Sequence, residues 1–145
     1  MAESNRTKTV RAVQVTREYR TEAGVFQALK GITVDIFHGE YVSIMGPSGS
    51  GKSTFFNIIG GLLKPSRGQV FIDDVDIARL SADELAWLRC RKIGYIFQAY
   101  NLLPSMTAME NVTVPMIFGG MNTDEALARG EEVLTLVGLR ERMFH

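Results

Sequence analysis

Nine consecutive residues in the first half of the chain have the types and the spacing needed to hold a phosphate group. They are Gly46, Pro47, Ser48, Gly49, Ser50, Gly51, Lys52, Ser53 and Thr54, and the first eight fit the P-loop pattern G-x-x-x-x-G-K-[ST]. The glycines allow the backbone to turn several N–H groups toward one anion. Lys52 would reach the β- and γ-phosphates, and the Ser53 hydroxyl would ligate Mg²⁺. The segment therefore predicts a nucleotide-phosphate site.

The segments on either side of this loop match the context that the pattern requires. Residues 41–45 (YVSIM) are an apolar run that predicts a strand of the parallel-sheet type, and residues 53–59 (STFFNII) predict a helix. A helix that starts at the loop adds its free N–H groups and its dipole to the attraction for an anion. The alternative is a Gly/Ser-rich surface turn that binds nothing, and the flanking strand and helix argue against it.

Hydrophobic patterns and turn residues predict the remaining elements. Alternating apolar residues predict strands, whereas capping residues followed by apolar periodicity predict helices. The predicted strands are residues 10–19, 25–29, 32–37, 69–72 and 93–97. The predicted helices are residues 82–91, 111–118 and a segment that begins after Asn122 and ends at Gly138. This order indicates an α/β protein with an antiparallel lobe, a P-loop strand and a helical segment.

The bulk composition is that of one globular domain. Of 145 residues, 46% are hydrophobic and 22% are charged, which suits a chain that folds around a core. Equal numbers of basic and acidic residues give no net charge, so nucleic-acid binding has no support. Neither a signal segment nor a run of ~20 apolar residues is present, so no direct membrane insertion is expected. Cys90 is the single cysteine, which suits a reducing cytosol, and we interpret it as buried or half-buried in a helix.

Two further residues could contact a nucleotide, and their types leave two interpretations open for each. Tyr19 ends the first predicted strand and could stack on a base or pack on the lobe as an ordinary aromatic residue. Gln98 follows an apolar strand at the end where α/β folds bind ligands, so it could ligate Mg²⁺, orient a water or simply be solvated. An acidic cluster is interpreted as turn residues rather than as metal ligands, and it comprises Asp73, Asp74 and Asp76.

Together these segments resemble the nucleotide-binding subunit of an ABC transporter. The resemblance rests on GPSGSGKST, with Tyr19 upstream and IGYIFQAYNLLPSMTAMENV downstream, and is greatest to the subfamily that powers lipoprotein release and macrolide-type export. The segments IIGGL, LSADELAWLR and VGL-x-x-R extend it over nearly all of residues 10–145. It implies that Tyr19 is the adenine-stacking aromatic, that residues 46–54 are the Walker A loop, and that Gln98 is the Q-loop glutamine at Mg²⁺ or the attacking water.

The resemblance also implies a fold, ligands, partners and a location. The fold would be an ABC-type P-loop NTPase domain over residues 10–145, with an antiparallel β lobe, a partial parallel core and the start of a helical lobe, preceded by a flexible arm at 1–9. ATP and Mg²⁺ would be the cofactors. A membrane permease subunit of an exporter and a second ATP-binding subunit would be the partners. The protein would lie on the cytoplasmic face of the membrane, as a peripheral subunit.

The sequence departs from the family pattern after the helical segment. In the family, a signature segment reading LSGGQ, a Walker B strand with its catalytic glutamate and a switch histidine come next, and residues 1–145 contain none of them. Phosphoryl transfer needs a positioned nucleophile as well as held phosphates. We therefore expect this chain to carry the Walker A and Q-loop half of the domain, truncated before the signature motif, and to turn over no ATP alone.

Two alternatives remain at this point. A non-catalytic fragment would at most bind nucleotide or dock on a permease. Another P-loop enzyme, such as a nucleotide kinase, is disfavoured by Gln98 in its Tyr-Ile-Phe-Gln context and by Tyr19. Apolar, deformable residues after Gln98 predict the contact surface for the membrane partner, with packing inside the helical lobe as the alternative. They are Leu102, Leu103, Met106, Met109 and Met116.

Overall fold

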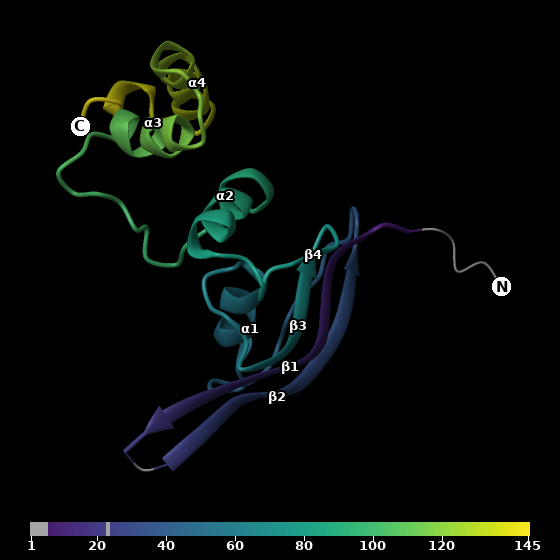
Figure 1. The fold of residues 1–145 in the computed structure, drawn as a ribbon. Coiled ribbons are helices and arrows are strands. Elements are labelled where there is room, and N and C mark those ends of the chain that lie inside the picture. Colours follow the sequence, from purple (N-terminus) through teal and green to yellow (C-terminus); the bar gives the residue numbers. More distant parts are fainter. Residues whose placement is uncertain (1–5, 23) are drawn as a thin grey trace. The chain divides into compact units, whose positions relative to one another are not determined.

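The computed structural model describes residues 6–22 and 24–145. In chain order its elements are β1 (Lys8–Thr21), β2 (Gly24–Phe37), α1 (Lys52–Ile59), β3 (Arg67–Ile72), β4 (Val75–Asp76), α2 (Ala82–Lys92), α3 (Ala108–Phe118), α4 (Thr123–Leu136) and the 3-10 helix η1 (Arg140–Arg142) (Figure 1). The chain divides into two compact units, Met1–Arg89 and Cys90–His145. The sequence predicts no boundary within residues 10–145, whereas this division falls inside α2.

The first unit is built on a four-stranded antiparallel sheet with the order β2-β1-β3-β4. Strand β1 pairs with β2 from Lys8 opposite Phe37 to Thr21 opposite Gly24, so the two short strands predicted at 25–29 and 32–37 are one continuous strand. Because β1 begins at Lys8, the last two residues of the predicted arm at 1–9 belong to the strand. Residues 1–5 of that arm lie outside the described residues.

An irregularity in the pairing bends the β1–β2 pair (Figure 1). The register shifts between Ala12 and Val15, and Gln14 at this point has a φ of 49°. Gly68 of β3 approaches so closely that a Cβ on it would lie 2.3 Å from the Gln14 carbonyl oxygen. Only glycine fits there, since its φ of 87° also disfavours other residues.

The core of the first unit lies between the sheet and its helices. Helix α1 contacts β1, β2 and β3 and buries Phe55 and Ile58. Helix α2 is tied to the turn after α1, because the Arg89 Nη1 donates to the Gly61 carbonyl oxygen at 2.8 Å. The buried hydrophobic residues of this unit are Ala12, Val15, Leu29, Phe55, Ile58, Val70, Ile72, Ile77, Leu85 and Leu88.

Two predicted strands are wrong. Residues 41–45 and 93–97 have no regular secondary structure, and Tyr41 and Ile96 are 96% and 98% exposed. A strand needs hydrogen bonds to a neighbouring strand, and no strand within residues 6–22 and 24–145 pairs with either segment. The parallel pairing expected of residues 41–45 is therefore not formed within the described part of the chain. The apolar sequence of both segments favours a strand, but no neighbouring strand among the described residues provides the hydrogen bonds that a strand needs.

The second unit is a pair of helices closed by the C-terminal segment. Helices α3 and α4 meet at Gly130, where a Cβ would lie 2.7 Å from the Met109 sulfur and 2.7 Å from the Thr113 methyl carbon. Met109, Leu134 and Met143 form its buried cluster. The absence of a side chain at Gly130 thus sets how closely the two helices approach.

Capping side chains begin three helices; α2 and α4 start where the sequence predicts them, whereas α3 starts at Ala108, three residues before the predicted start at 111. The pairs are Ser81 with Glu84, Thr107 with Glu110, and Asn122 with Glu125. In the first two pairs the hydroxyl accepts from the glutamate N–H and the carboxylate accepts from the hydroxyl residue's N–H. These backbone hydrogen bonds from Ser81 and Thr107 hold the pKa of Glu84 and of Glu110 below its usual value.

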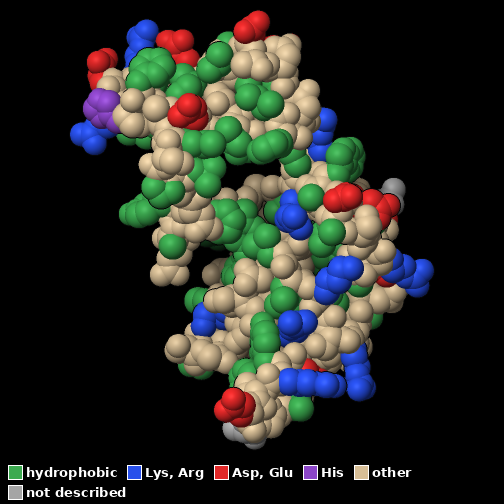
Figure 2. Space-filling model, turned by 60° about the vertical axis from the view of Figure 1, so that its left-hand side comes forward, with side chains coloured by type: hydrophobic (Ala, Val, Ile, Leu, Met, Phe, Trp, Pro, Cys, Tyr) green, Lys and Arg blue, Asp and Glu red, His purple; other side chains and the backbone are tan. Residues whose placement is uncertain are grey.

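Hydrophobic side chains reach the surface at many places on the face drawn in Figure 2. Cys90 is exposed, so its interpretation as a buried or half-buried residue is wrong. Among the described residues, no helix has the length and apolar character needed to span a membrane.

Candidate phosphate-binding site

The P-loop leads into a helix whose first turn has no side-chain cap. Gly51 is the N-cap residue of α1, and it makes no capping hydrogen bond with a side chain. The first N–H groups of any helix lack partners within the helix. At α1 these groups belong to Lys52, Ser53 and Thr54. They are the donors that an anion can accept from, with the helix dipole in its favour.

Gly51 seats the loop against the sheet. Its φ is 91°, and a Cβ on it would lie 2.6 Å from the carbonyl oxygen of Ala28 in β2. Both the backbone conformation and the close approach require glycine. The start of α1 is thus fixed relative to β2.

The Lys52 ammonium group lies over the loop that precedes it. Its Nζ donates to the Gly46 carbonyl oxygen at 2.8 Å, to the Pro47 carbonyl oxygen at 2.7 Å and to the Ser50 Oγ at 3.4 Å. The loop is also closed by the Ser50 N–H, which donates to the Pro47 carbonyl oxygen at 3.3 Å. A positive charge is therefore held beside the uncapped end of α1.

A cavity of about 270 Å³ opens over this end of the helix. It is lined by Tyr19, Phe26, Ala28, Ser48, Gly49, Gly51, Lys52, Ser53 and Thr54. Lys52 is the one charged side chain among these described lining residues. Tyr19 and Phe26 line the cavity with aromatic rings. The loop and the start of α1 line it with N–H groups, hydroxyls and the Lys52 ammonium group. A ligand with a flat ring and an anionic tail matches this division.

Two side chains beside Tyr19 were not predicted from the sequence: Phe26, which forms the aromatic wall of the cavity with Tyr19, and Arg17, which lies outside the lining. Phe26 lies opposite Tyr19 in the β1–β2 pairing and shares the cavity with it. The Arg17 guanidinium carbon lies 4.8 Å from the centre of the Tyr19 ring, and the Arg17 Nη1 donates to the Lys64 carbonyl oxygen at 3.0 Å. Spacing along the strand places Arg17 and Tyr19 on one face, but Phe26 depends on the hairpin register.

The structure brings most of the predicted site residues together. Seven of them line the cavity, namely Tyr19, Ser48, Gly49, Gly51, Lys52, Ser53 and Thr54. The other three loop residues, Gly46, Pro47 and Ser50, hold the Lys52 ammonium group. Gln98 belongs to the second unit, where it is exposed in a bend. Its role at the nucleotide stays a prediction.

Asp73 and Asp74 of the acidic cluster form a turn, as expected, whereas Asp76 is the last residue of β4 and pairs with Arg79. Asp73 and Asp74 have φ values of 45° and 63° between β3 and β4, which is the conformation of a tight hairpin turn. Within the described residues, no group of three or more His, Cys, Asp or Glu side chains could hold a metal ion.

In the second unit, Asn111 organises the segment after Gln98. Its Oδ1 accepts from the Leu103 N–H at 2.8 Å, and its Nδ2 donates to the carbonyl oxygens of Leu103, Met106 and Thr107. Leu102, Leu103 and Met106 are 63%, 48% and 37% exposed on this fixed turn. The prediction of a contact surface is wrong for Met109, which is a core residue, while Met116 is half-buried.

Comparison with known proteins identifies the family. The family model described as ABC transporter matches residues 29–144. An uncharacterized ABC transporter ATP-binding protein of Thermotoga maritima is 46% identical over 138 residues, which are 95% of this chain and 59% of that protein. The macrolide export ATP-binding/permease protein MacB of Marinobacter nauticus is 50% identical over 131 residues, which are 90% of this chain and 20% of that protein.

A solved structure of a relative agrees with this assignment. It is the dimeric post-hydrolysis state of the ATP-binding cassette MJ0796 bound to ADP and Pi, with a TM-score of 0.85 and 46% identity, covering 93% of this chain and 60% of that chain. This chain spans about three fifths of the length of these cassettes. The uncapped helix, the glycine loop and the sequence identity lead to one conclusion: the chain belongs to the ABC transporter family and has the fold of part of its ATP-binding domain.

Proposed function

We propose that this chain binds ATP together with Mg²⁺ as part of an ABC transporter's ATP-binding subunit, over residues 10–145. The observation that carries the proposal is the cavity that joins the uncapped start of α1 and Lys52 to the aromatic pair Tyr19 and Phe26. The uncapped N–H groups at the start of α1 and the Lys52 ammonium group fit the phosphates of a nucleoside triphosphate. The ADP-bound relative supports the same ligand class.

Each residue then has a role set by its chemistry. The loop N–H groups and Lys52 hold the phosphates, and the Ser53 hydroxyl is the Mg²⁺ ligand. Tyr19 stacks on the adenine ring, with Phe26 beside it and Arg17 bracing the Tyr19 ring. Gln98 is proposed as the further contact to Mg²⁺ or to the attacking water.

Binding is proposed without turnover for the polypeptide of residues 1–145. The described lining of the cavity includes no carboxylate that could act as a general base. Holding substrate and transition state equally well does not accelerate a reaction. General-base assistance is worth roughly 10²–10⁴-fold, so ATP hydrolysis by these residues alone should stay at background.

The proposed partners are a membrane permease and a second ATP-binding subunit. A relative whose name joins ATP-binding and permease functions, and a relative solved as a dimer, support these partners. The exposed side chains of Leu102, Leu103 and Met106, on the turn that Asn111 fixes, are the proposed permease contact. Export would be driven from the cytoplasmic face of the membrane, where the subunit would be peripheral.

Replacing Lys52 by alanine tests the proposed function. Lys52→Ala removes the ammonium group and leaves the backbone donors, so ATP affinity should fall at least tenfold, or ~1.4 kcal/mol. Calorimetric titration with MgATP measures it. Lys8→Ala is the matched control, because Lys8 forms only an exposed ion pair with Asp35. Equal affinity of Lys52→Ala and the parent would refute the phosphate site, and Lys52-dependent hydrolysis by the parent would refute binding without turnover.

A further inference from the structure

A second cavity in the first unit takes no part in the site described above. Its volume is about 490 Å³, and it is lined by Val75, Leu80, Asp83, Glu84, Trp87 and Leu88. These side chains come from β4, from the segment that joins β4 to α2, and from the first two turns of α2. The lining is mostly apolar, and Val75 and Trp87 are 41% and 61% exposed. A hollow of this size accepts a large apolar side chain.

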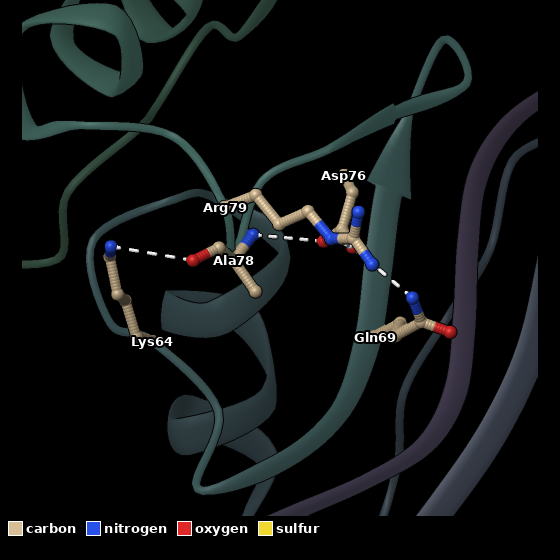
Figure 3. A network of polar contacts seen from close by, with 5 residues as sticks. All are labelled: Lys64, Gln69, Asp76, Ala78 and Arg79. Carbon is tan, nitrogen blue, oxygen red and sulfur yellow. Dashed lines mark hydrogen bonds and ion pairs between the residues drawn. The ribbon is translucent and has the colours of Figure 1, made fainter.

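The wall between β4 and α2 is held in place by a polar network (Figure 3). The Lys64 Nζ donates to the carbonyl oxygens of Ala78 at 3.4 Å and Leu80 at 3.0 Å. The Asp76 carboxylate accepts from the Ala78 N–H at 3.1 Å and pairs with the Arg79 Nε at 3.3 Å. These contacts fix the backbone from Asp76 to Leu80. An incoming group would therefore meet a wall that is already ordered, which lowers the entropic cost of binding.

The helical wall is fixed as well. Reciprocal hydrogen bonds between Ser81 and Glu84 start α2, and Leu88 is buried one turn later on the same face. The Arg89 Nη1 ties the helix to the Gly61 carbonyl oxygen. Trp87 and Glu84 are thus presented by a helix that is anchored at both ends of the cavity.

The rim of the cavity carries negative charge. Asp83 and Glu84 are the charged side chains among its described lining residues. The hydrogen bonds from Ser81 keep the pKa of Glu84 low, so its carboxylate is ionised at neutral pH. The nearby Arg79 is already paired with Asp76. The complement of this surface is an apolar group with positive charge beside it.

We propose that this acid-rimmed cavity docks a polypeptide segment that presents one large apolar side chain between lysines or arginines. The apolar side chain would enter against Leu80 and Trp87, and the cationic side chains would face Asp83 and Glu84. The carboxylates disfavour the anionic surfaces of nucleic acids and acidic lipids by like-charge repulsion. The proposal stands apart from the nucleotide site, because the two cavities share no lining residue.

The single tryptophan of the chain makes the docking measurable. Trp87 is the one tryptophan in the sequence, and it lines the cavity, so its fluorescence reports on this site alone. The probe is a synthetic helical peptide with a single leucine flanked by four lysines, and its matched control has glutamates at the lysine positions. Titration with the lysine peptide should shift the Trp87 emission maximum until the shift saturates. The affinity obtained from this curve should fall at least about fivefold between low and high salt. The glutamate peptide should cause no shift.

Two matched variants separate charge recognition from helix stability. Asp83→Lys should weaken binding of the lysine peptide at least about fivefold and allow binding of the glutamate peptide. Asp124→Lys makes the same change in the first turn of α4, at a residue that is not part of the cavity lining, and should leave peptide binding unchanged. Val75→Ser, at an exposed residue, keeps the test available if Asp83→Lys fails to fold, and it should weaken binding as well.

The outcomes decide the proposal. Equal binding of the two peptides, or no shift with either, would overturn it. An equal emission shift on adding phosphatidylcholine vesicles would assign the cavity to a lipid surface and would also overturn it. Peptide binding that persists in Lys52→Ala, with or without ATP, is expected. This keeps the result independent of the nucleotide site.

Discussion

The N–H groups at the start of α1 and at the start of α3 have different hydrogen-bond partners. Each helix begins with N–H groups that have no partner within the helix. At α3, the Thr107 hydroxyl accepts from the Glu110 N–H, and the N–H groups of Ala108 and Met109 donate to carbonyl oxygens of the C-terminal segment. At α1, Gly51 provides no side chain, and no acidic residue lies in the first turn. The N–H groups at the start of α3 are occupied by hydrogen bonds within the second unit, whereas those at the start of α1 remain available to a ligand.

The difference shows that the residue at the N-cap position decides whether a helix start is capped or can bind an anion. A capping box stabilises the helix whatever else is present. A glycine in the left-handed conformation gives up that stabilisation and lets Lys52 and the loop approach the same point. The missing stabilisation of α1 is supplied by packing of Phe55 and Ile58 against the sheet. Anion binding at the start of α1 therefore depends on the burial of Phe55 and Ile58, which keeps the uncapped helix folded.

The largest effect is expected from adding a side chain at the open start. Gly51→Ala forces alanine into a φ of 91° and places its Cβ 2.6 Å from the Ala28 carbonyl oxygen. Strain and overlap should lower the free energy of unfolding by about 2–4 kcal/mol, and ATP affinity should fall more than in Lys52→Ala. Urea denaturation and calorimetry measure the two effects.

Gly49→Ala is its matched control. Gly49 has a similar φ of 80°, but nothing lies within 4 Å of its Cβ position. It should therefore show only the conformational cost, about 1 kcal/mol. If the two variants were equally stable, the close approach of the loop to β2 would not be a constraint.

Removing the capping side chain of α3 should lower the stability of the protein and leave its ATP affinity unchanged. Thr107→Ala removes the capping hydroxyl of α3 and should lower the free energy of unfolding by roughly 1 kcal/mol. ATP affinity should be unchanged, because Thr107 is not among the residues that line the nucleotide cavity. Thermal unfolding and MgATP titration of the same preparation measure both quantities. A loss of ATP affinity would show that capping of α3 and nucleotide binding are coupled.

Changing the aromatic wall should separate the ring of the nucleotide from its phosphates. Tyr19→Ala should weaken ATP binding by about 1 kcal/mol, whereas Tyr19→Phe should be nearly neutral, since stacking needs the ring and not the hydroxyl. Binding of inorganic triphosphate should be the same in all three proteins, because the open helix start holds only the phosphates. A large loss in Tyr19→Phe would contradict stacking.

The smallest effect concerns pH. The Thr107 backbone hydrogen bond keeps the folded-state pKa of Glu110 below its ordinary value of 4.5. The stabilisation is therefore present above pH 4.5 and is lost as the pH falls through the folded-state pKa. Urea denaturation between about pH 3 and pH 6 should show this loss, and Glu110→Gln should flatten it. The start of α1, which has no acidic residue in its first turn, should make no such contribution.

Features that depend on neighbours in the sequence were predicted well. The capping pairs, the glycine loop and the start of α1 follow from residue types a few positions apart. Features that depend on distant partners were not. Residues 41–45 and 93–97 have the composition of strands, but pairing decides whether a strand forms. Likewise, Phe26 joins the cavity through hairpin register, and Asn111 acts through a turn up to eight residues away.

The exposure of these two apolar segments has a consequence for the behaviour of the protein in solution. Residues 41–45 and 93–97 are short, uncharged and free of proline, and they are rich in β-branched and aromatic residues. Segments of this kind, when they lie open to solvent, associate edge to edge between molecules. With Tyr41 and Ile96 almost fully exposed, self-association should rise steeply with protein concentration. A single charged substitution, such as Ser43→Lys, would act as a gatekeeper against such aggregates.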